Sequence, residues 1–184
     1  MIIRKKYTVE IAHVLENSYT ERCQSLHGHR GVIEVFLERK GSLDKNGMVI
    51  DFSMLKKGTP IGDFINSFDH SFVMEKDSEH KMYIKSKFDR WIEMFDVPAA
   101  ENLSLIIHYY IDKLIKNHPF YEEYKNFVKC NSVIYHETDT GYAQTQIEDL
   151  LQNLERKIQF SESIMRDWAY PVKDYTWDLY TYLE

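Results

Sequence analysis

The alternation of residues 29–39 is the feature that most constrains the fold of this chain. Ile33, Val35 and Leu37 fall on one face of an extended segment, while Val32, Glu34 and Glu38 fall on the other. Residues 2–14 alternate more loosely and are rich in β-branched types, which predicts another strand. The two segments are expected to pair, so one face of a sheet must be covered by other elements.

The helices expected to cover that face are marked by spacing and caps. The clearest runs from Glu101 to Asn117, after Pro98 and with an acidic first turn. Its apolar face carries Leu103, Ile106, Ile107, Tyr110 and Leu114. A shorter helix is expected over 52–57 after the N-cap Asp51, and another from Pro60 to residue 68, capped by Thr59.

The remaining segments complete an α+β pattern. We expect a loop over 15–26, a turn over 40–47, resumed strand over 48–50, an irregular insert over 75–96 with a short helix near 79–87, a strand over 127–137, and a turn over 138–142 into a last short strand. The order is β-β-α-insert-α-β-β. Paired strands around paired helices predict an antiparallel sheet in an α+β fold.

The character of the chain changes beyond residue 142. Helical spacing is seen at Ile147, Leu150, Leu151, Leu154 and Ile158. An aromatic tail follows, in which buried packing is expected for Trp168, Tyr170, Tyr175, Trp177 and Tyr180. No Gly/Ser linker precedes the region. We therefore divide the chain into a core domain, 1–143, and a C-terminal helical and aromatic extension of the same domain, 144–184.

Length and charge narrow the class of protein. The chain has 184 residues and a net charge of −6, with no long basic run, so nucleic-acid binding is not indicated. No apolar run approaches the roughly 20 residues that span a membrane, and the N-terminus lacks the apolar core of a signal peptide. Its 2 cysteines make no disulfide scaffold. These features predict a cytoplasmic protein with neither a nucleic-acid nor a membrane partner.

Three histidines form the candidate metal site. His27 and His29 are two residues apart, so on a strand their side chains project to the same face. His13 ends the first expected strand, next to the second, and supplies a third imidazole. Three imidazoles with an open fourth position are typical of catalytic zinc. The alternative is a group of polar surface histidines near a turn.

The two cysteines contrast in their surroundings. Cys23 precedes His27 by four residues, and a thiol close to a metal and histidines can act as base or nucleophile. An inert structural thiol is the alternative for Cys23. Cys130 lies among apolar residues of an expected strand, where the inert interpretation is favoured.

Two further motifs carry carboxylates. Asp69 and His70 could support proton transfer, although adjacent residues on an extended chain face opposite ways, and a histidine favourably placed at a helix C-terminus is as good an interpretation. Glu137, between His136 and Thr138 at the end of an expected strand, could accept two N–H groups from a heterocycle. An ordinary solvated strand end is the alternative for Glu137.

Taken in order, these pieces resemble the 6-pyruvoyl-tetrahydropterin synthase / 6-carboxy-tetrahydropterin synthase family. The matching text is IAH ending at His13, CQSLHGH over 23–29, GMVIDF over 47–52, Asp69-His70, PAAEN over 98–102, and Glu137-Thr138. The resemblance spans about residues 3–143. It implies a tunnelling fold, with an antiparallel four-stranded sheet and two main helices that oligomerise into a β-barrel, and a homohexamer built as a dimer of trimers.

The resemblance also implies roles for individual residues. The family's zinc ligands correspond to His13, His27 and His29. Its catalytic residues correspond to Cys23, Asp69, His70 and Glu137, and the glutamate also anchors the pterin ring. The substrate-binding segment corresponds to Ala99, Ala100 and Glu101. The family often has Thr or Ser where this chain has the two alanines, so contacts with the ring are expected to differ.

The short gap between Cys23 and His27 resembles the bacterial carboxy-forming members of the queuosine pathway. The implied reaction converts 7,8-dihydroneopterin triphosphate to 6-carboxy-5,6,7,8-tetrahydropterin, with loss of acetaldehyde and triphosphate, in 7-deazaguanine biosynthesis. The rivals are a 6-pyruvoyl-tetrahydropterin synthase, a non-catalytic pterin- or purine-binding protein, and a zinc-stabilised structural module. The active site is expected to be completed by a neighbouring subunit.

Overall fold

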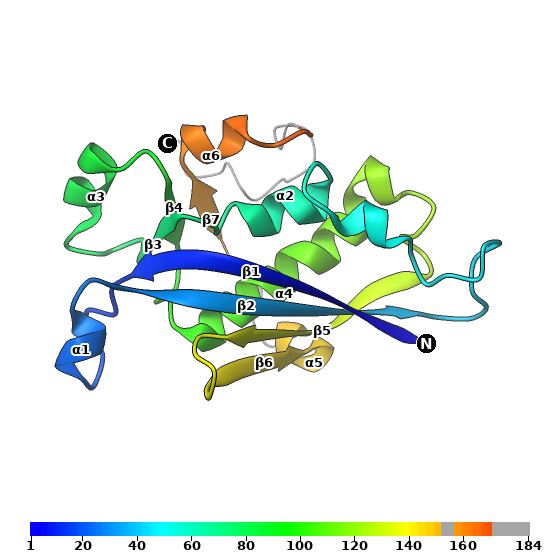
Figure 1. Ribbon diagram of the computed structural model, residues 1–184, viewed down its shortest axis with the longest axis horizontal. Coiled ribbons are helices and arrows are strands. Elements are labelled where there is room, and N and C mark those ends of the chain that lie inside the picture. The colour runs from blue at the N-terminus through cyan, green and yellow to red at the C-terminus, as the bar shows by residue number, and fades with distance from the viewer. Residues whose placement is uncertain (152–156, 171–184) are drawn as a thin grey trace.

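A single mixed sheet runs through the part of the chain that the computed structural model describes, residues 1–151 and 157–170 (Figure 1). Within these residues the sheet has 7 strands in the order β6-β5-β2-β1-β3-β4-β7. The strands are β1 Ile2–His13, β2 His27–Arg39, β3 Ser71–Glu75, β4 Trp91–Met94, β5 Val128–His136, β6 Tyr142–Gln146 and β7 Ile158–Phe160.

The helices are unequal in length. They are α1 Glu21–Gln24, α2 Pro60–Asn66, α3 Lys81–Lys87, α4 Ala100–Asn117, α5 Ile147–Leu151 and α6 Glu162–Arg166, with 3₁₀ turns at Phe52–Leu55 and Pro119–Tyr121. The long helix α4 packs on β5 and β6 and contacts α2. No helix of the described residues is both long enough and apolar enough to cross a membrane.

The hairpin of β1 and β2 is the centre of the sheet. Its antiparallel register runs from Ile2 opposite Glu38 to His13 opposite His27. Ile33, Val35 and Leu37 are fully buried in the core, which confirms the face predicted from the alternation. The five predicted apolar residues of α4 are buried in the same core. The caps predicted for α2 are also present, with Gly62 N–H donating to Thr59 Oγ1 at 3.3 Å.

Two short elements differ from the prediction. The helix expected over 52–57 is only the 3₁₀ turn Phe52–Leu55, and residues 48–50 are not a strand. The Met48 N–H donates to the side chain of Asp44, and the Val49 carbonyl accepts from Arg39 Nη1 at 3.2 Å. These side chains occupy the backbone groups that a sheet ladder needs.

The expectation of a four-stranded antiparallel sheet is wrong for this chain, because β3, β4 and β7 extend it beyond β1. β3 is parallel to β1, and β4 is parallel to β3. Strand β4 was not predicted within the charged segment 75–96, because Glu93 interrupts the apolar run of the strand. In the folded chain the Glu93 carboxylate is buried between the ammonium groups of Lys81, at 3.0 Å, and Lys85, at 2.6 Å.

Within the described residues, the extension beyond residue 143 is less helical than its spacing indicated. α5 ends at Leu151, and Ile158 belongs to β7, which pairs antiparallel with β4. Trp168 is buried against Phe64 and Phe160, as expected, and the ring of Tyr170 contacts those of His118 and Phe120. The predictions for Tyr175, Trp177, Tyr180 and Leu154 concern positions outside the described residues. The division at residue 143 stays a prediction, and strand β6 crosses it.

We predict that Gly62→Ala destabilises the chain although alanine favours helices. A Cβ on Gly62 would lie 1.9 Å from the Lys56 carbonyl oxygen, a backbone atom that cannot swing away. The propensity gain of about 1 kcal/mol is outweighed by overpacking, so the unfolding free energy should fall by more than about 2 kcal/mol. Urea unfolding measures the change. An unchanged or raised midpoint for Gly62→Ala would contradict the packing argument.

Candidate metal centre

Three histidines meet at the end of the β1–β2 hairpin. His13 and His27 are register partners, and His29 follows on the same face of β2. Their ring centroids are 4.5 to 5.3 Å apart, and one nitrogen of each lies within 4.8 Å of the others. His13 is fully buried, whereas His27 and His29 are half-buried. The structure thus brings together the predicted ligand set.

Backbone carbonyls fix the ring tautomers of two of these histidines. His13 Nδ1 lies 2.8 Å from the Pro98 carbonyl oxygen, and His27 Nδ1 lies 2.7 Å from that of Ser25. A carbonyl only accepts, so each Nδ1 donates and each Nε2 carries a lone pair. The two Nε2 atoms face each other at 3.1 Å. Facing lone pairs repel unless a cation lies between them, so this donor set fits a metal ion.

Glu137 adds negative charge to the same place. Its Oε1 lies 3.8 Å from His13 Nε2, and the residue follows β5 in the turn to β6. Burial, with smaller contributions from His27 and His29, lowers the pKa of His13 to about 4, while the hydrogen bond to Pro98 opposes the shift. His13 is therefore neutral at pH 7, which is the form that binds a metal.

The neutral, buried His13 predicts acid sensitivity of the metal-free protein. Its pKa is about 4 in the folded chain against 6.5 for an ordinary histidine, so the unfolded chain binds more protons between these values. This contribution to stability is fully present above pH 6.5 and is lost as the pH falls towards 4, by roughly 3 kcal/mol at most. Urea unfolding after chelation, at pH 7 and pH 4.5, measures the loss. His13→Asn does not titrate there, and an equal loss in that variant would contradict the assignment.

Asp69 and His70 form a turn between α2 and β3. His70 has a φ of 55°, and this left-handed conformation lets the two adjacent side chains meet, with Asp69 Oδ2 3.1 Å from His70 Nδ1. Such a contact is not expected between adjacent residues of an extended segment, whose side chains face opposite ways. α2 ends at Asn66, so the pair lies beyond the helix C-terminus. The backbone of Glu10 holds the turn, donating its N–H to Asp69 Oδ1 at 2.9 Å and accepting the His70 N–H at 2.7 Å.

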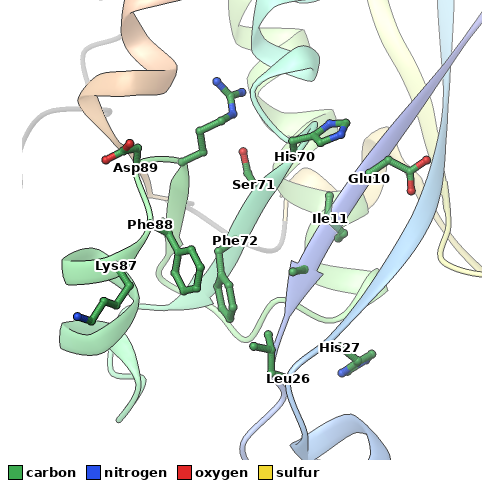
Figure 2. A pocket seen from close by; sticks show the side chains of 12 residues that line it. Glu10, Ile11, Leu26, His27, His70, Ser71, Phe72, Lys87, Phe88 and Asp89 are labelled. Atoms are coloured by element: carbon green, nitrogen blue, oxygen red, sulfur yellow. The ribbon is translucent and has the colours of Figure 1, made fainter.

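His70 and His27 line one pocket of about 580 Å³ (Figure 2). Its wall is largely apolar, with Ile11, Phe72 and Phe88 between the two histidines. The rings of Phe72 and Phe88 stack at 6.1 Å. The pocket therefore joins the exposed imidazole of the Asp69–His70 turn to the edge of the histidine cluster, and its volume suits a small organic molecule.

Cys23 lies in α1, within the segment that leads into β2. Its N–H donates to the capping hydroxyl of Thr20 at 3.4 Å, and its carbonyl accepts from Leu15. The thiol is free and half-buried, and it does not belong to the histidine group defined by the 4.8 Å separation. Cys130 is completely buried in β5, where burial raises the pKa of its thiol, in keeping with an inert role.

The segment before α4 approaches the metal centre through its backbone. Pro98 contributes the carbonyl that orients His13, a role that no side-chain pattern could have revealed. Ala99 and Ala100 follow at the start of α4, with no side-chain cap. Glu101 is exposed and lines a smaller pocket of about 200 Å³ beside β6. Within the described residues, a second group able to bind a metal comprises Glu16, Glu79 and His80, all at least partly exposed.

Comparison with known proteins assigns the family. Residues 2–148 match the family described as 6-pyruvoyl tetrahydropterin synthase. The chain belongs to the 6-pyruvoyl tetrahydropterin synthase family. A 6-carboxy-5,6,7,8-tetrahydropterin synthase from Helicobacter pylori is 31% identical over 178 residues, covering 91% of this chain and 86% of the relative. One from Haemophilus influenzae is 27% identical, covering 78% of this chain and 97% of the relative.

Solved structures share the fold of the family. An uncharacterized protein from Wolinella succinogenes superposes with a TM-score of 0.64 at 20% identity, covering 80% of this chain and 98% of that chain. The 6-pyruvoyl tetrahydropterin synthase of Plasmodium vivax gives a TM-score of 0.55 at 18% identity, covering 79% and 97%. The predicted α+β class and tunnelling fold of the single chain are thereby confirmed, whereas the sheet is larger and mixed and the oligomeric barrel stays a prediction.

Proposed function

We propose that this member of the 6-pyruvoyl tetrahydropterin synthase family is a 6-carboxy-5,6,7,8-tetrahydropterin synthase. It would convert 7,8-dihydroneopterin triphosphate to the 6-carboxy product with loss of acetaldehyde and triphosphate, in queuosine or other 7-deazaguanine biosynthesis. The observation that carries the proposal is the histidine cluster with Glu137 beside it. The Helicobacter pylori relative that bears this name, similar over 91% of the chain, supports the choice of product.

His13, His27 and His29 would hold a Zn²⁺ ion. Three imidazole ligands and an open position are typical of catalytic rather than structural zinc, which argues against the zinc-stabilised module. When bound, the ion supplies Lewis acidity to oxygen atoms of the substrate. The carbonyls of Pro98 and Ser25 keep the Nε2 atoms of His13 and His27 aimed at the centre without further adjustment.

The other site residues would bind the ring and move protons. The Glu137 carboxylate would accept two N–H groups of the pterin, a charge-assisted pair that fixes the ring plane. Ala99, Ala100 and Glu101 would border the ring with fewer hydroxyl contacts than relatives have. Cys23 and His70 would transfer protons at the side-chain carbons, and Asp69, 3.1 Å from His70 Nδ1, would orient that imidazole.

We also propose the assembly in which this chemistry takes place. A homohexamer, a dimer of trimers with sheets joined into barrels, would complete the active site with residues of a neighbouring subunit, so that Cys23 and Glu137 in one pocket need not come from one chain. The partly exposed Glu137 would remain with its own His13, 3.8 Å away. The cytoplasm, where a free thiol such as Cys23 stays reduced, is the compartment that suits the enzyme.

The product of turnover tests the proposal. The zinc-loaded protein is incubated with 7,8-dihydroneopterin triphosphate, and acetaldehyde is trapped while the pterin is identified by mass. Acetaldehyde in equal amount to the 6-carboxy pterin is expected. A pyruvoyl pterin without acetaldehyde would make the protein a 6-pyruvoyl-tetrahydropterin synthase instead. Tight binding with neither product would favour the non-catalytic pterin- or purine-binding alternative.

A further inference from the structure

The Asp69–His70 turn is held by a part of the chain that lies outside the residues matched to the family. The match ends at residue 148, whereas β7 and α6 follow it; β7 pairs with β4 at the edge of the sheet, and α6 comes directly after β7 (Figure 1). We propose that the segment 158–169 is a positioning element for the Asp69–His70 turn, acting through Asp167 and Trp168. The inference rests on the proposed function for its catalytic consequence.

The turn needs such support because its conformation is unfavourable. His70 has a φ of 55°, and among the described residues no other non-glycine residue has a positive φ. A β-carbon makes this region sparsely populated, so it persists only where the surroundings determine it. Its imidazole is 74% exposed, so packing around the ring does not hold it in place. The Asp69 carboxylate, 3.1 Å from His70 Nδ1, and the backbone of the turn must do so.

One anchor lies on the α2 side of the turn. The indole Nε1 of Trp168 donates to Ser67 Oγ at 2.8 Å, and Trp168 is only 9% exposed. The next residue, Ala169, donates its N–H to Asp63 Oδ2 at 2.9 Å. Ser67 is the residue that caps α2, two positions before Asp69. The segment therefore fixes the point at which the chain leaves the helix.

The other anchor is a guanidinium bridge on the β4 side. Arg90 Nη1 lies 2.6 Å from Asp167 Oδ2, and Arg90 Nη2 donates to the Asp69 carbonyl oxygen at 3.2 Å. Arg90 stands immediately before β4, whose Trp91 carbonyl accepts the Ser161 N–H at 3.0 Å. Asp167 thus holds the guanidinium against the peptide that joins Asp69 to His70. Asp167 is a positioning residue, since it reaches the imidazole only through Arg90 and the backbone, whereas Arg90 also lines the pocket beside His70.

Asp167→Asn tests the bridge with little change in shape. We expect kcat for the pterin substrate to fall about tenfold with KM within twofold, because a displaced imidazole impairs proton transfer more than binding. The hydrogen-exchange rate of the His70 backbone amide, measured by NMR on the substrate-free protein, should rise at least tenfold. Asp167→Glu should restore both. Trp168→Phe keeps an apolar ring but lacks the Nε1 donor, and should quicken the same amide.

The control is Glu122→Gln, which breaks the exposed pair between Glu122 and Lys125, 2.7 Å apart and far along the chain. Glu122→Gln should change neither kcat nor the exchange rate of the His70 amide. An Asp167→Asn protein with parent-like kcat, or with exchange raised equally throughout the sheet, would overturn the inference. If the parent protein turns over no pterin, the proposed function fails, while the exchange of the His70 amide still decides whether the segment holds the turn.

Discussion

Replacing His27 with alanine should lower the affinity for zinc by at least about 100-fold and abolish turnover at micromolar metal. His27 is the best ligand to remove, because it is half-buried and its loss leaves no sealed cavity. Its Nε2 faces that of His13 at 3.1 Å, so the variant also relieves the repulsion between two lone pairs. The metal-free variant should therefore be about as stable as the metal-free parent. Metal content after dialysis and urea unfolding measure the two effects.

His80→Ala is the matched control for metal binding. His80 belongs to the exposed group with Glu16 and Glu79, which can also approach a cation. The control should keep one bound zinc per chain and the parent rate. If His80→Ala loses zinc while His27→Ala retains it, the metal centre has been assigned to the wrong group. If chelation unfolds the parent protein, the zinc is structural rather than catalytic.

The sequence predicted the elements whose signal is local. The β1–β2 hairpin followed from alternation, and the cap of α2 from Thr59 before Pro60, because each depends on residues close in the chain. The strands β3 and β4 did not follow, because parallel pairing joins distant segments and leaves no turn between them. Strand β7 pairs antiparallel with β4 but lies far from it in the chain, so no hairpin turn marks that pair either. In β4, the sequence alone suggests that Glu93 is exposed, because its ion pairs with Lys81 and Lys85 of α3 form only in the folded chain.

In the candidate site too, some features could be predicted from the sequence and others could not. His13, His27 and His29 could be predicted because strand pairing is enough to bring them together. The contact between Asp69 and His70 could not, since it depends on the left-handed φ of His70, which tertiary contacts impose. Nor could the role of Pro98, since every residue type carries a carbonyl group. The part played by Cys23 remains a prediction.

Cys23→Ala should lower kcat by about 100- to 10,000-fold while zinc binding is retained. The reason is that the thiol lies in α1, close in sequence to His27, yet stands outside the group of nitrogens within 4.8 Å of one another. A residue that moves a proton without binding the metal should affect the rate alone. Cys23→Ser keeps a donor of similar size and, being a much weaker acid, should recover little of the rate. Steady-state kinetics with metal analysis on the same samples separates rate from occupancy.

Cys130→Ala is the control for Cys23→Ala, because it should reduce stability and leave the rate unchanged. Cys130 is fully buried in β5 among core residues, so its replacement leaves a small cavity and should reduce the unfolding free energy by about 1 kcal/mol. Its rate should equal that of the parent, because no path joins this thiol to solvent or substrate. If Cys23→Ala instead kept the parent rate, proton transfer would have to be assigned to His70 alone. If Cys23→Ala lost zinc together with activity, the thiol would be a ligand, and the open position of the three-histidine centre would be occupied by the protein itself.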